Sequence, residues 1–361
     1  MTGQLFTLSA GLALAALPAL AEMPALDALD PGWNTLSPGG ETGCAPGTPY
    51  HFSVHPGRAD RLFVFLNGGG ACWNATLCDL QTEPTPFVPL ADLGHNDPRE
   101  HGGVFRLDHP ENPFADWSMV FVSYCTGDVH LGTRTDGYTG QDGAAITAEH
   151  RGRPNAMAAL DWTRAQFDAP EQVMVAGSSA GALAAPFYAA LLADAWPEAR
   201  MTALGDGAGG YRTGPLEAVF RAWGLLEDLP DWPELADSGY DSFVFEDFWR
   251  VARSRHPDMV LAQFNNAHDA VQEQFLRLLG FADPVYPLLT ANLEEVEQTV
   301  PGFVHYLAGG NVHTILRSDN VYGYTQNGVR FVDWLAGLTT DTLPASVHCG
   351  GAEDCEGEPL P

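Results

Sequence analysis

Short apolar runs alternate along the chain with stretches whose apolar residues recur every three or four positions. A buried strand needs a continuous run of apolar residues, whereas a helix packs through one face, so each pattern predicts an element. The predicted strands are residues 61–66, 117–124, 171–177, 201–205, 259–264 and 302–307. The predicted helices are residues 154–168, 180–195 and 328–338. Strands that alternate with helices predict an α/β fold, with a mostly parallel sheet covered by helices on both faces.

Four segments interrupt this rhythm. Residues 22–60 are rich in Pro and Gly and are predicted to form an N-terminal arm with short strands. Residues 80–103 and 133–152 are predicted to be long loops because they are polar and rich in Gly. Residues 215–258 combine aromatic and acidic side chains. Two interpretations of this last segment stay open, an inserted helical cap and ordinary packing of amphipathic helices on the sheet.

The one long apolar run of the chain, residues 5–21, lies near its N-terminus. Ala19-Leu20-Ala21 before Glu22 fits a small-x-small cleavage site, so residues 1–21 are predicted to be a signal peptide and the protein to be secreted or periplasmic. An uncleaved N-terminal anchor is the alternative, since no Lys or Arg precedes the run. No later stretch has the length and hydropathy of a membrane span. Residues 22–361 are predicted to form a single domain.

The 46 acidic residues outnumber the 17 basic residues, which gives a formal net charge of −29. Such a chain repels nucleic acid and anionic membranes, so neither is an expected partner. The charge also argues against a strongly polyanionic substrate. Its simplest interpretation is solubility in a salty exterior.

All six cysteines follow the predicted cleavage site, in agreement with export. An even number of cysteines in an oxidising compartment predicts disulfides, although spacing alone leaves their pairing open. Buried free thiols or a zinc site are the alternatives, but no C-x2-C pair is present. The six residues are Cys44, Cys72, Cys78, Cys125, Cys349 and Cys355.

The segment Gly177-Ser178-Ser179-Ala180-Gly181 matches the pattern G-x-S-x-G between a predicted strand and a predicted helix. This is the context of a nucleophile elbow, where small neighbours let strand and helix approach while the serine adopts a strained turn. Ser179 is therefore the candidate nucleophile of an α/β-hydrolase catalytic domain. Ser178 occupies the x position and is expected to point away. A glycine-rich turn without chemistry is the alternative.

A second glycine-rich turn, Asn67-Gly68-Gly69-Gly70-Ala71, follows an earlier predicted strand. Acyl transfer needs main-chain N–H donors aimed at the oxyanion, and in this fold they come from such a turn and from the residue after the nucleophile, here Ala180. A phosphate-binding loop is the alternative, but no Lys-Ser or Lys-Thr follows the glycines.

The acid of a triad follows the nucleophile in this fold, and the histidine follows the acid. Asp206 and Asp269 both come after predicted strands, and spacing barely separates them. Of the later histidines, His305 lies within a predicted strand and His348 lies in an irregular tail. His313 follows a strand directly, in a loop that can carry an imidazole over the serine, so it is the favoured base.

Histidine can also bind metal, and three histidines lie in the predicted loop and just beyond it. Their spacing matches no known metal site, so we interpret them as solvated loop residues and expect neither metal nor organic cofactor. They are His95, His101 and His109.

At these residues the chain resembles the pectin acetylesterase/Notum family of serine carboxylesterases. Leu66–Cys72 is similar to the family's L-E-G-G-G-W-C segment, and Val120–Asp128 to its V-x-x-x-Y-C-x-x-D strand. Gly177–Gly181 looks like its nucleophile motif, and Asn266–Gln272 resembles its N-A-x-D-x-x-Q acid motif. Because the four motifs occur together and in order, they are far more specific than any one of them.

The resemblance implies a triad of Ser179, His313 and Asp269. It implies an oxyanion hole formed by the N–H groups of Gly69, Gly70 and Ala180. It also implies the disulfides Cys44–Cys125 and Cys72–Cys78, which leaves Cys349–Cys355.

Two departures from the family pattern change the pocket wall, Asn67 in place of Glu and Ala71 in place of Trp. Neither pectin nor a lipid-modified protein is therefore carried over as the substrate. The sequence predicts a serine esterase that hydrolyses a carboxylic ester, with an O-acetyl group on a carbohydrate as the favoured substrate. The alternatives are a broader carboxylesterase or lipase-like deacylase, an amidase, and a non-catalytic binding protein on a hydrolase scaffold.

Overall fold

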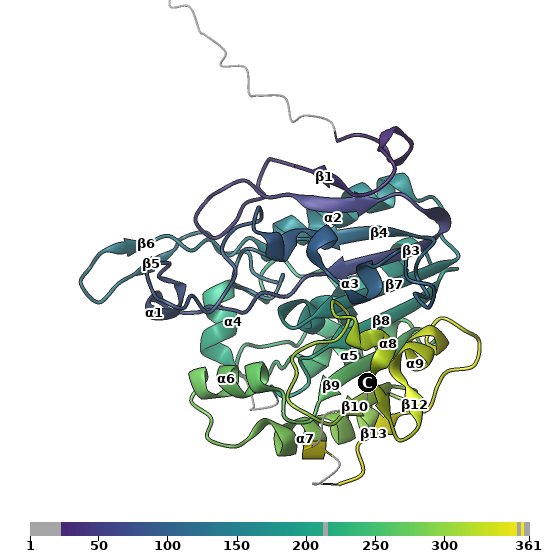
Figure 1. Cartoon of the computed structure of the whole chain (residues 1–361). Coiled ribbons are helices and arrows are strands. Elements are labelled where there is room, and N and C mark those ends of the chain that lie inside the picture. The colour runs from purple at the N-terminus through teal and green to yellow at the C-terminus, as the bar shows by residue number, and fades with distance from the viewer. Residues whose placement is uncertain (1–22, 212–215, 352–354, 357–361) are drawn as a thin grey trace, which may run out of the picture.

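The computed structural model describes residues 23–211, 216–351 and 355–356. The predicted signal peptide, residues 1–21, lies outside the described residues. A sheet of nine strands runs through the molecule (Figure 1). Strand pairs β1–β2 and β2–β4 are antiparallel, and all other neighbours are parallel. Across the sheet the strands are β1 (Asn34–Leu36), β2 (Phe52–His55), β4 (Trp117–Val122), β3 (Arg58–Leu66), β7 (Gln172–Ser178), β8 (Arg200–Asp206), β9 (Val260–Asn266), β10 (Val304–Ala308) and β13 (Val347–His348).

Helices cover both faces of this sheet, so the predicted α/β-hydrolase type of fold is confirmed. In β3, Val64 belongs to the apolar cluster on one face and Phe65 to the cluster on the other, as the period of two in a strand requires. Helices α2 to α5 and α7 pack on the first face, and α8 and α9 on the second. The helices are α1 (Ala75–Cys78), α2 (Gly152–Gln166), α3 (Ala180–Ala195), α4 (Glu217–Trp223), α5 (Glu246–Arg255), α6 (Ala270–Leu278), α7 (Val285–Thr299), α8 (Asn320–Gly323) and α9 (Phe331–Gly337).

The segments between these elements hold short structure that periodicity does not reveal. The first predicted long loop contains 3-10 turns at Gly94–Asn96, Pro98–Glu100 and Gly103–Phe105, the last of which extends beyond it. The second contains a hairpin of β5 (Tyr138–Thr139) and β6 (Ala145–Ile146), which projects from the body next to α1 (Figure 1). The remaining 3-10 turns are Leu26–Ala28 and Pro233–Leu235.

The last predicted helix begins three residues later than expected. Asn327 and Gly328 both have positive φ, 53° and 76°, and form the turn of a hairpin between β11 (Thr325–Gln326) and β12 (Val329–Arg330). An Asn-Gly pair favours this turn because both residues tolerate left-handed backbone. Helix α9 therefore starts only at Phe331.

The aromatic segment 215–258 divides into two parts in the structure. Helix α5 packs on α3, with the ring centroids of Phe248 and Phe187 5.1 Å apart, as in ordinary packing on the sheet. Helix α4 instead contributes Val219 and Trp223 to a pocket beside the sheet.

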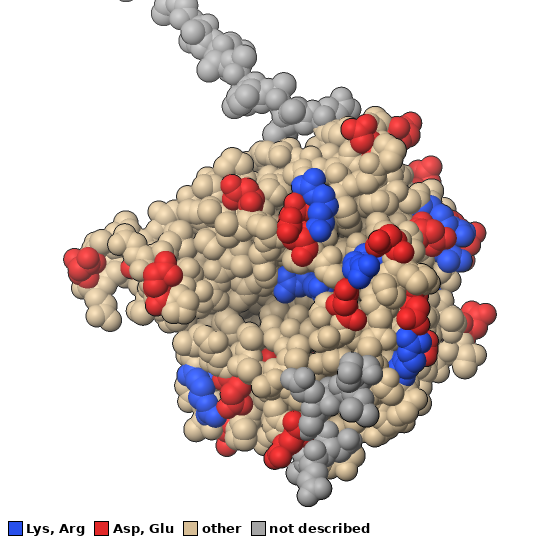
Figure 2. All heavy atoms as spheres, viewed as in Figure 1, with Lys and Arg blue, Asp and Glu red and all other residues tan. Residues whose placement is uncertain are grey.

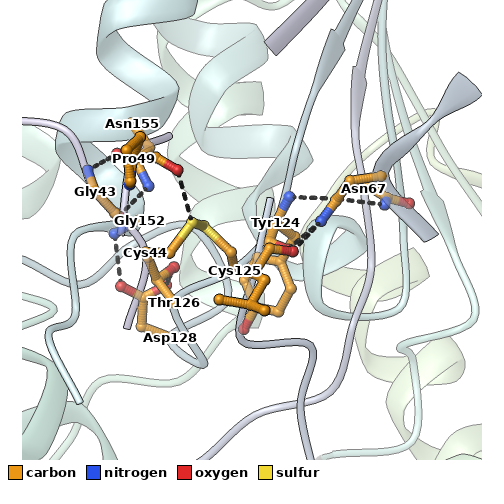
Figure 3. Close-up of a disulfide and its surroundings, with 12 residues drawn as sticks. Gly43, Cys44, Pro49, Asn67, Tyr124, Cys125, Thr126, Asp128, Gly152 and Asn155 are labelled. Atoms are coloured by element: carbon orange, nitrogen blue, oxygen red, sulfur yellow. Dashed lines mark hydrogen bonds between the residues drawn. A yellow bond between two sulfur atoms is a disulfide. The ribbon is translucent and has the colours of Figure 1, made fainter. Parts of the chain in front are cut away.

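Three disulfides join the pairs that the resemblance implies, Cys44–Cys125, Cys72–Cys78 and Cys349–Cys355. The first spans 81 residues and ties the N-terminal arm to the end of β4. Figure 3 shows it between the hydrogen bonds that join Gly43 to Asn155 and the side chain of Tyr124. Among the described residues, no helix combines the length and hydropathy that a membrane span requires.

Candidate active site

The register of the parallel strands brings three functional segments to one edge of the sheet. Leu66 pairs with Gly177, and Ser178 pairs with Asp206. The carboxyl ends of β3, β7 and β8 therefore meet there, which is where open α/β sheets bind their ligands.

Ser179 lies in the sharp turn between β7 and α3, with φ 54° and ψ −119°. This conformation is strained for a residue with a Cβ and is held by the surrounding structure. A Cβ on Gly177 would overlap the Gly181 carbonyl, and one on Gly181 would overlap that of Leu66. Both glycines are therefore required by close approach. The Ser178 hydroxyl is turned away and donates to Asp206 Oδ2 at 2.6 Å.

The glycine turn lies directly against the candidate nucleophile, since a Cβ on Gly68 would be 2.8 Å from Ser179 Cβ. The carbonyl groups of its first four residues each have their own donor. The donors are His130 Nε2 for Asn67, His95 Nε2 for Gly68, Val88 N for Gly69 and the Tyr124 hydroxyl for Gly70, at 2.8 to 2.9 Å. Among the described residues, the N–H groups of Gly69 and Gly70 have no acceptor. The turn thus holds its carbonyls in place and leaves two donors free.

Two buried histidines that hold this turn are neutral near pH 7. Burial and, after it, the positive charge of Arg317 together lower the pKa of His95 to about 4. Burial lowers the pKa of His130 to about 4 as well. A carbonyl oxygen only accepts hydrogen bonds, so the neutral ring of His130 carries its proton on Nε2. His95 Nε2 lies 2.9 Å from the Gly68 carbonyl oxygen and 3.1 Å from Arg317 Nη1.

Asp269 is fully buried at the end of β9 and caps the N-terminus of α6. Its Oδ1 accepts from the N–H groups of Val271 and Gln272 at 2.9 and 3.0 Å. Its Oδ2 accepts from Gln272 Nε2 at 3.0 Å and lies 2.7 Å from His313 Nδ1. The carboxylate is thus fixed by three protein donors and can orient one imidazole.

His313 lies in the loop after β10. Because Nδ1 donates to Asp269, a neutral imidazole presents its lone pair on Nε2. That nitrogen is buried and has no hydrogen-bond partner among the described residues. No hydrogen bond joins it to Ser179 Oγ in the described structure. The lone pair on Nε2 is therefore available to accept a proton.

Asp206, the other candidate acid, has different partners. Its carboxylate accepts from the Ser178 hydroxyl and from the N–H groups of Ile315 and Leu316 at 3.0 to 3.1 Å. Burial raises its pKa, while these hydrogen bonds act in the opposite direction. Asp206 makes no hydrogen bond to the imidazole of His313 among the described residues.

The other candidate histidines lie elsewhere. His305 Nδ1 is 3.0 Å from Glu297, and the ring of His348 lies 5.8 Å from that of His305 at the β10–β13 edge of the sheet. His109 stacks on Tyr322. His101 packs against Phe105 and Phe121 and is half-buried, so it is not the solvated loop residue that the sequence predicted. His95 was wrongly predicted to be solvated for the same reason, since it supports the glycine turn.

Two clusters of His and Cys atoms have the proximity of metal ligands. One is Cys72, Cys78 and His150, and the other is His348, Cys349 and Cys355. Both cysteines of each cluster form a disulfide, so their sulfur atoms are not available as thiolates.

An apolar pocket opens beside Ser179, with an empty volume of about 450 Å³ that includes space open to solvent. The glycine turn, α3, α4 and α6 form its walls. Sequence analysis missed this pocket, and only the aromatic residues of segment 215–258 hinted at it. Its lining residues are Gly70, Ala71, Trp73, Val129, Ser179, Ala180, Leu183, Tyr211, Leu216, Val219, Trp223, Phe245, Phe275 and Leu279.

Acidic side chains prevail on the surface, as the net charge requires. On the face shown in Figure 2, most basic side chains lie beside acidic ones. Arg106 pairs with Asp319 at 2.9 Å and Arg330 with Glu111 at 2.7 Å. Paired arginines of this kind leave little positive charge for a polyanionic ligand.

Residues 40–212 match the sequence model of the pectinacetylesterase family. This match supports a pectin acetylesterase/Notum-like family assignment. The segment that matches contains the glycine turn and Ser179, whereas Asp269 and His313 lie beyond it. No curated protein matched the chain. The resemblance to the pectinacetylesterase family suggests a carboxylesterase.

Proposed function

We propose that this protein is a secreted serine esterase of the pectinacetylesterase type, which removes O-acetyl groups from a carbohydrate through Ser179, His313 and Asp269. The observation that carries the proposal is the imidazole of His313. Its Nδ1 lies 2.7 Å from the Asp269 carboxylate, and its buried Nε2 has no other partner among the described residues. The family match supports the esterase class, and the predicted signal peptide and the three disulfides support secretion.

In the proposed first step, His313 Nε2 takes the proton of the Ser179 hydroxyl while Ser179 Oγ bonds to the ester carbonyl carbon. The tetrahedral adduct collapses, the bond to the alcohol oxygen breaks, and the imidazolium returns the proton to that oxygen. Water then adds to the acyl carbon while His313 Nε2 takes one of its protons. The bond between Ser179 Oγ and the acyl carbon breaks, the imidazolium returns the proton to Ser179 Oγ, and the carboxylic acid leaves. Asp269 stabilises the imidazolium throughout.

The negative charge of each adduct needs donors beside Ser179. The free N–H groups of Gly69 and Gly70 and that of Ala180, the first residue of α3, are suited to this role. The N-terminal end of α3 adds a favourable dipole. The four donors that hold the carbonyls of the glycine turn keep it from rotating, so the donors need no reorganisation during the reaction.

Acyl-enzyme chemistry is tested directly by two measurements on the purified protein. A fluorophosphonate probe should label Ser179, as mapped by peptide mass spectrometry. Ser179→Ala should lower kcat on p-nitrophenyl acetate by about 10⁴-fold or more, as in other triads. Ser242→Ala, on an exposed turn, is the control and should leave the rate unchanged. Near wild-type activity of Ser179→Ala would reject the assignment, and absence of all activity in the wild type would favour a binding protein.

The apolar pocket supports a second candidate, a carboxylesterase for acyl chains longer than acetyl. An acetyl group carries one methyl, whereas the pocket presents side chains such as Leu183, Val219 and Phe245 next to the nucleophile. Each CH₂ buried in such a pocket contributes about 0.8 kcal/mol to binding. A series of p-nitrophenyl esters from acetate to octanoate separates the two candidates.

Two further measurements address the substrate and the compartment. Release of acetate from acetylated xylan and acetylated pectin tests the carbohydrate class, and activity restricted to long-chain p-nitrophenyl esters would exclude it. Expression of the full chain with N-terminal sequencing tests export. Mature protein is expected to begin at Glu22, and recovery of intact Met1 only in the cell interior would contradict secretion.

A further inference from the structure

Asp206 connects the nucleophile turn to the histidine loop. On one side, its main-chain carbonyl accepts from Ser179 N at 2.7 Å, and its carboxylate accepts from the Ser178 hydroxyl. On the other side, the carboxylate accepts from the N–H groups of Ile315 and Leu316. These two residues follow His313 by two and three positions. One fully buried side chain thus binds the loops that carry the candidate nucleophile and the candidate base.

In each of these loops, a residue with strained backbone lies at or next to a hydrogen bond to Asp206. Ser179 has φ 54°, and Thr314 has φ 61°. Left-handed backbone is a genuine outlier for a β-branched residue such as Thr314 and costs free energy. It persists only where the surroundings compensate, and here the bond from Ile315 N begins directly after the strained residue. Gly207 also packs closely against Thr314, since a Cβ added to this glycine would lie 2.9 Å from Thr314 Cγ2.

A carboxylate is the side chain that these surroundings require. The groups that face it are all donors, namely one hydroxyl and two main-chain N–H groups. An amide would turn its NH₂ group toward at least one of them, and an apolar side chain would leave buried donors without partners. The buried guanidinium of Arg317 adds an electrostatic attraction to Asp206. It also donates to Asn67 Oδ1 at 2.9 Å, which extends the network to the glycine turn.

We propose that Asp206 is a positioning residue, which holds the His313 loop and the Ser179 turn in the relative placement that proton transfer needs. The inference rests on the proposed function, because it assigns Asp206 a role in the geometry of that triad. Asp206 does not touch the reacting atoms. It acts by keeping Thr314 in its strained conformation, so that the imidazole stays over the nucleophile turn rather than relaxing away from it.

The test uses the full mature chain and three variants. Asp206→Asn is expected to lower kcat on p-nitrophenyl acetate about 100-fold, with KM within threefold, because displacement of a catalytic group by about 1 Å costs that much. Thr314→Gly removes the backbone strain at this position. The double variant Asp206→Asn with Thr314→Gly should therefore have a kcat about tenfold higher than Asp206→Asn alone. Ser178→Ala removes one of the donors and should lower kcat about threefold to tenfold.

Hydrogen exchange gives a second readout that needs no esterase activity. In Asp206→Asn, amide exchange of the peptide covering residues 311–318 should rise at least tenfold, with smaller changes elsewhere. Asp128→Asn is the matched control, since Asp128 is equally buried and accepts from a hydroxyl and a main-chain N–H, at Thr126 and Gly152. Its exchange changes should be centred on its own loop and leave 311–318 unaffected.

The outcomes separate the two proposals. Wild-type kcat and unchanged exchange at 311–318 in Asp206→Asn would overturn the positioning role. A uniform rise of exchange over the whole chain would also overturn it, since that marks general destabilisation. If Asp206→Asn does not fold, Ser178→Ala decides by the same exchange readout. A wild type that hydrolyses no ester would refute the proposed function, while localised exchange in the variant would still support the contacts of Asp206.

Discussion

A single methyl group added at Gly68 tests how closely the glycine turn approaches the nucleophile. The Cβ of Gly68→Ala would lie 2.6 Å from the Ser178 carbonyl oxygen and 2.8 Å from Ser179 Cβ. The backbone of Gly68 has no positive φ, so alanine brings no conformational penalty and the effect comes from these contacts alone. Both contacts involve atoms of the strained turn, which cannot rotate away as the end of a flexible side chain could.

The size of the effect follows from the distances. Ordinary contact begins at 3.4 Å, so the 2.6 Å contact must open by about 0.8 Å through movement of the glycine turn, the nucleophile turn or both. Displacement of a catalytic group by about 1 Å costs about 100-fold in rate. We therefore expect kcat to fall about 30- to 100-fold, and overpacking to lower the free energy of unfolding by about 1–3 kcal/mol.

The assay is steady-state hydrolysis of p-nitrophenyl acetate, together with urea denaturation of the same samples. Gly94→Ala is the control, because this exposed glycine has only Glu100 Cγ near its added Cβ, at 3.9 Å. It should stay within twofold of wild type in kcat. Folded Gly68→Ala with kcat within threefold of wild type would show that the turn does not constrain Ser179, and the reasoning would fail.

Two further predictions concern stability. The chain-entropy model assigns about 4.5 kcal/mol to the disulfide Cys44–Cys125, with a separation of 81 residues, and about 2.4 kcal/mol to Cys72–Cys78, with a separation of six. Alanine replacement of the first pair should therefore lower the urea midpoint about twice as much as replacement of the second. Equal losses would contradict the entropic account. Three histidines have a pKa lowered to about 4, by burial in each case and for two of them also by the charge of Arg317. They remain neutral in the folded state, whereas their unfolded forms take up protons below about pH 6.5. Together these three side chains should therefore take up about 2.6 protons on unfolding near pH 5. They should contribute a slope of about 3.6 kcal/mol per pH unit to the fall in the free energy of unfolding as the pH drops from 6 to 4.5, and nothing above pH 7. His101→Phe should remove about a third of that slope in urea titrations at several pH values, and an unchanged slope would refute the assignment. The three histidines are His95, His101 and His130.

Local patterns predicted most elements of the sheet. Continuous apolar runs gave the positions of β3, β4, β7, β8, β9 and β10 within a few residues, because parallel strands buried on both faces are mostly apolar. Helices α6 and α7 and strand β13 had no such signal. Helix α6 begins directly after Asp269, so its start depends on a carboxylate that also faces His313.

The candidate site residues also fall into two groups, those that the sequence alone identified and those that only the folded structure distinguished. The sequence alone determined the nucleophile turn and the glycine turn, since each depends on neighbours within a few positions and on the space that glycines leave. It did not separate Asp206 from Asp269, because each follows a parallel strand at the same edge of the sheet. Their roles differ only through the path of the loop after β10, which turns His313 Nδ1 toward one carboxylate and the N–H groups of Ile315 and Leu316 toward the other.

The apolar pocket was likewise decided by the tertiary structure. Trp73, Leu183, Val219 and Phe275 come from four separate segments and share a wall only after α3, α4 and α6 pack beside the glycine turn. Short-range periodicity reports which face of an element is buried, but it carries no information on which distant element covers that face. Side chains that meet across long loops are therefore known only from the folded chain, while the turns and strands that place them are encoded locally.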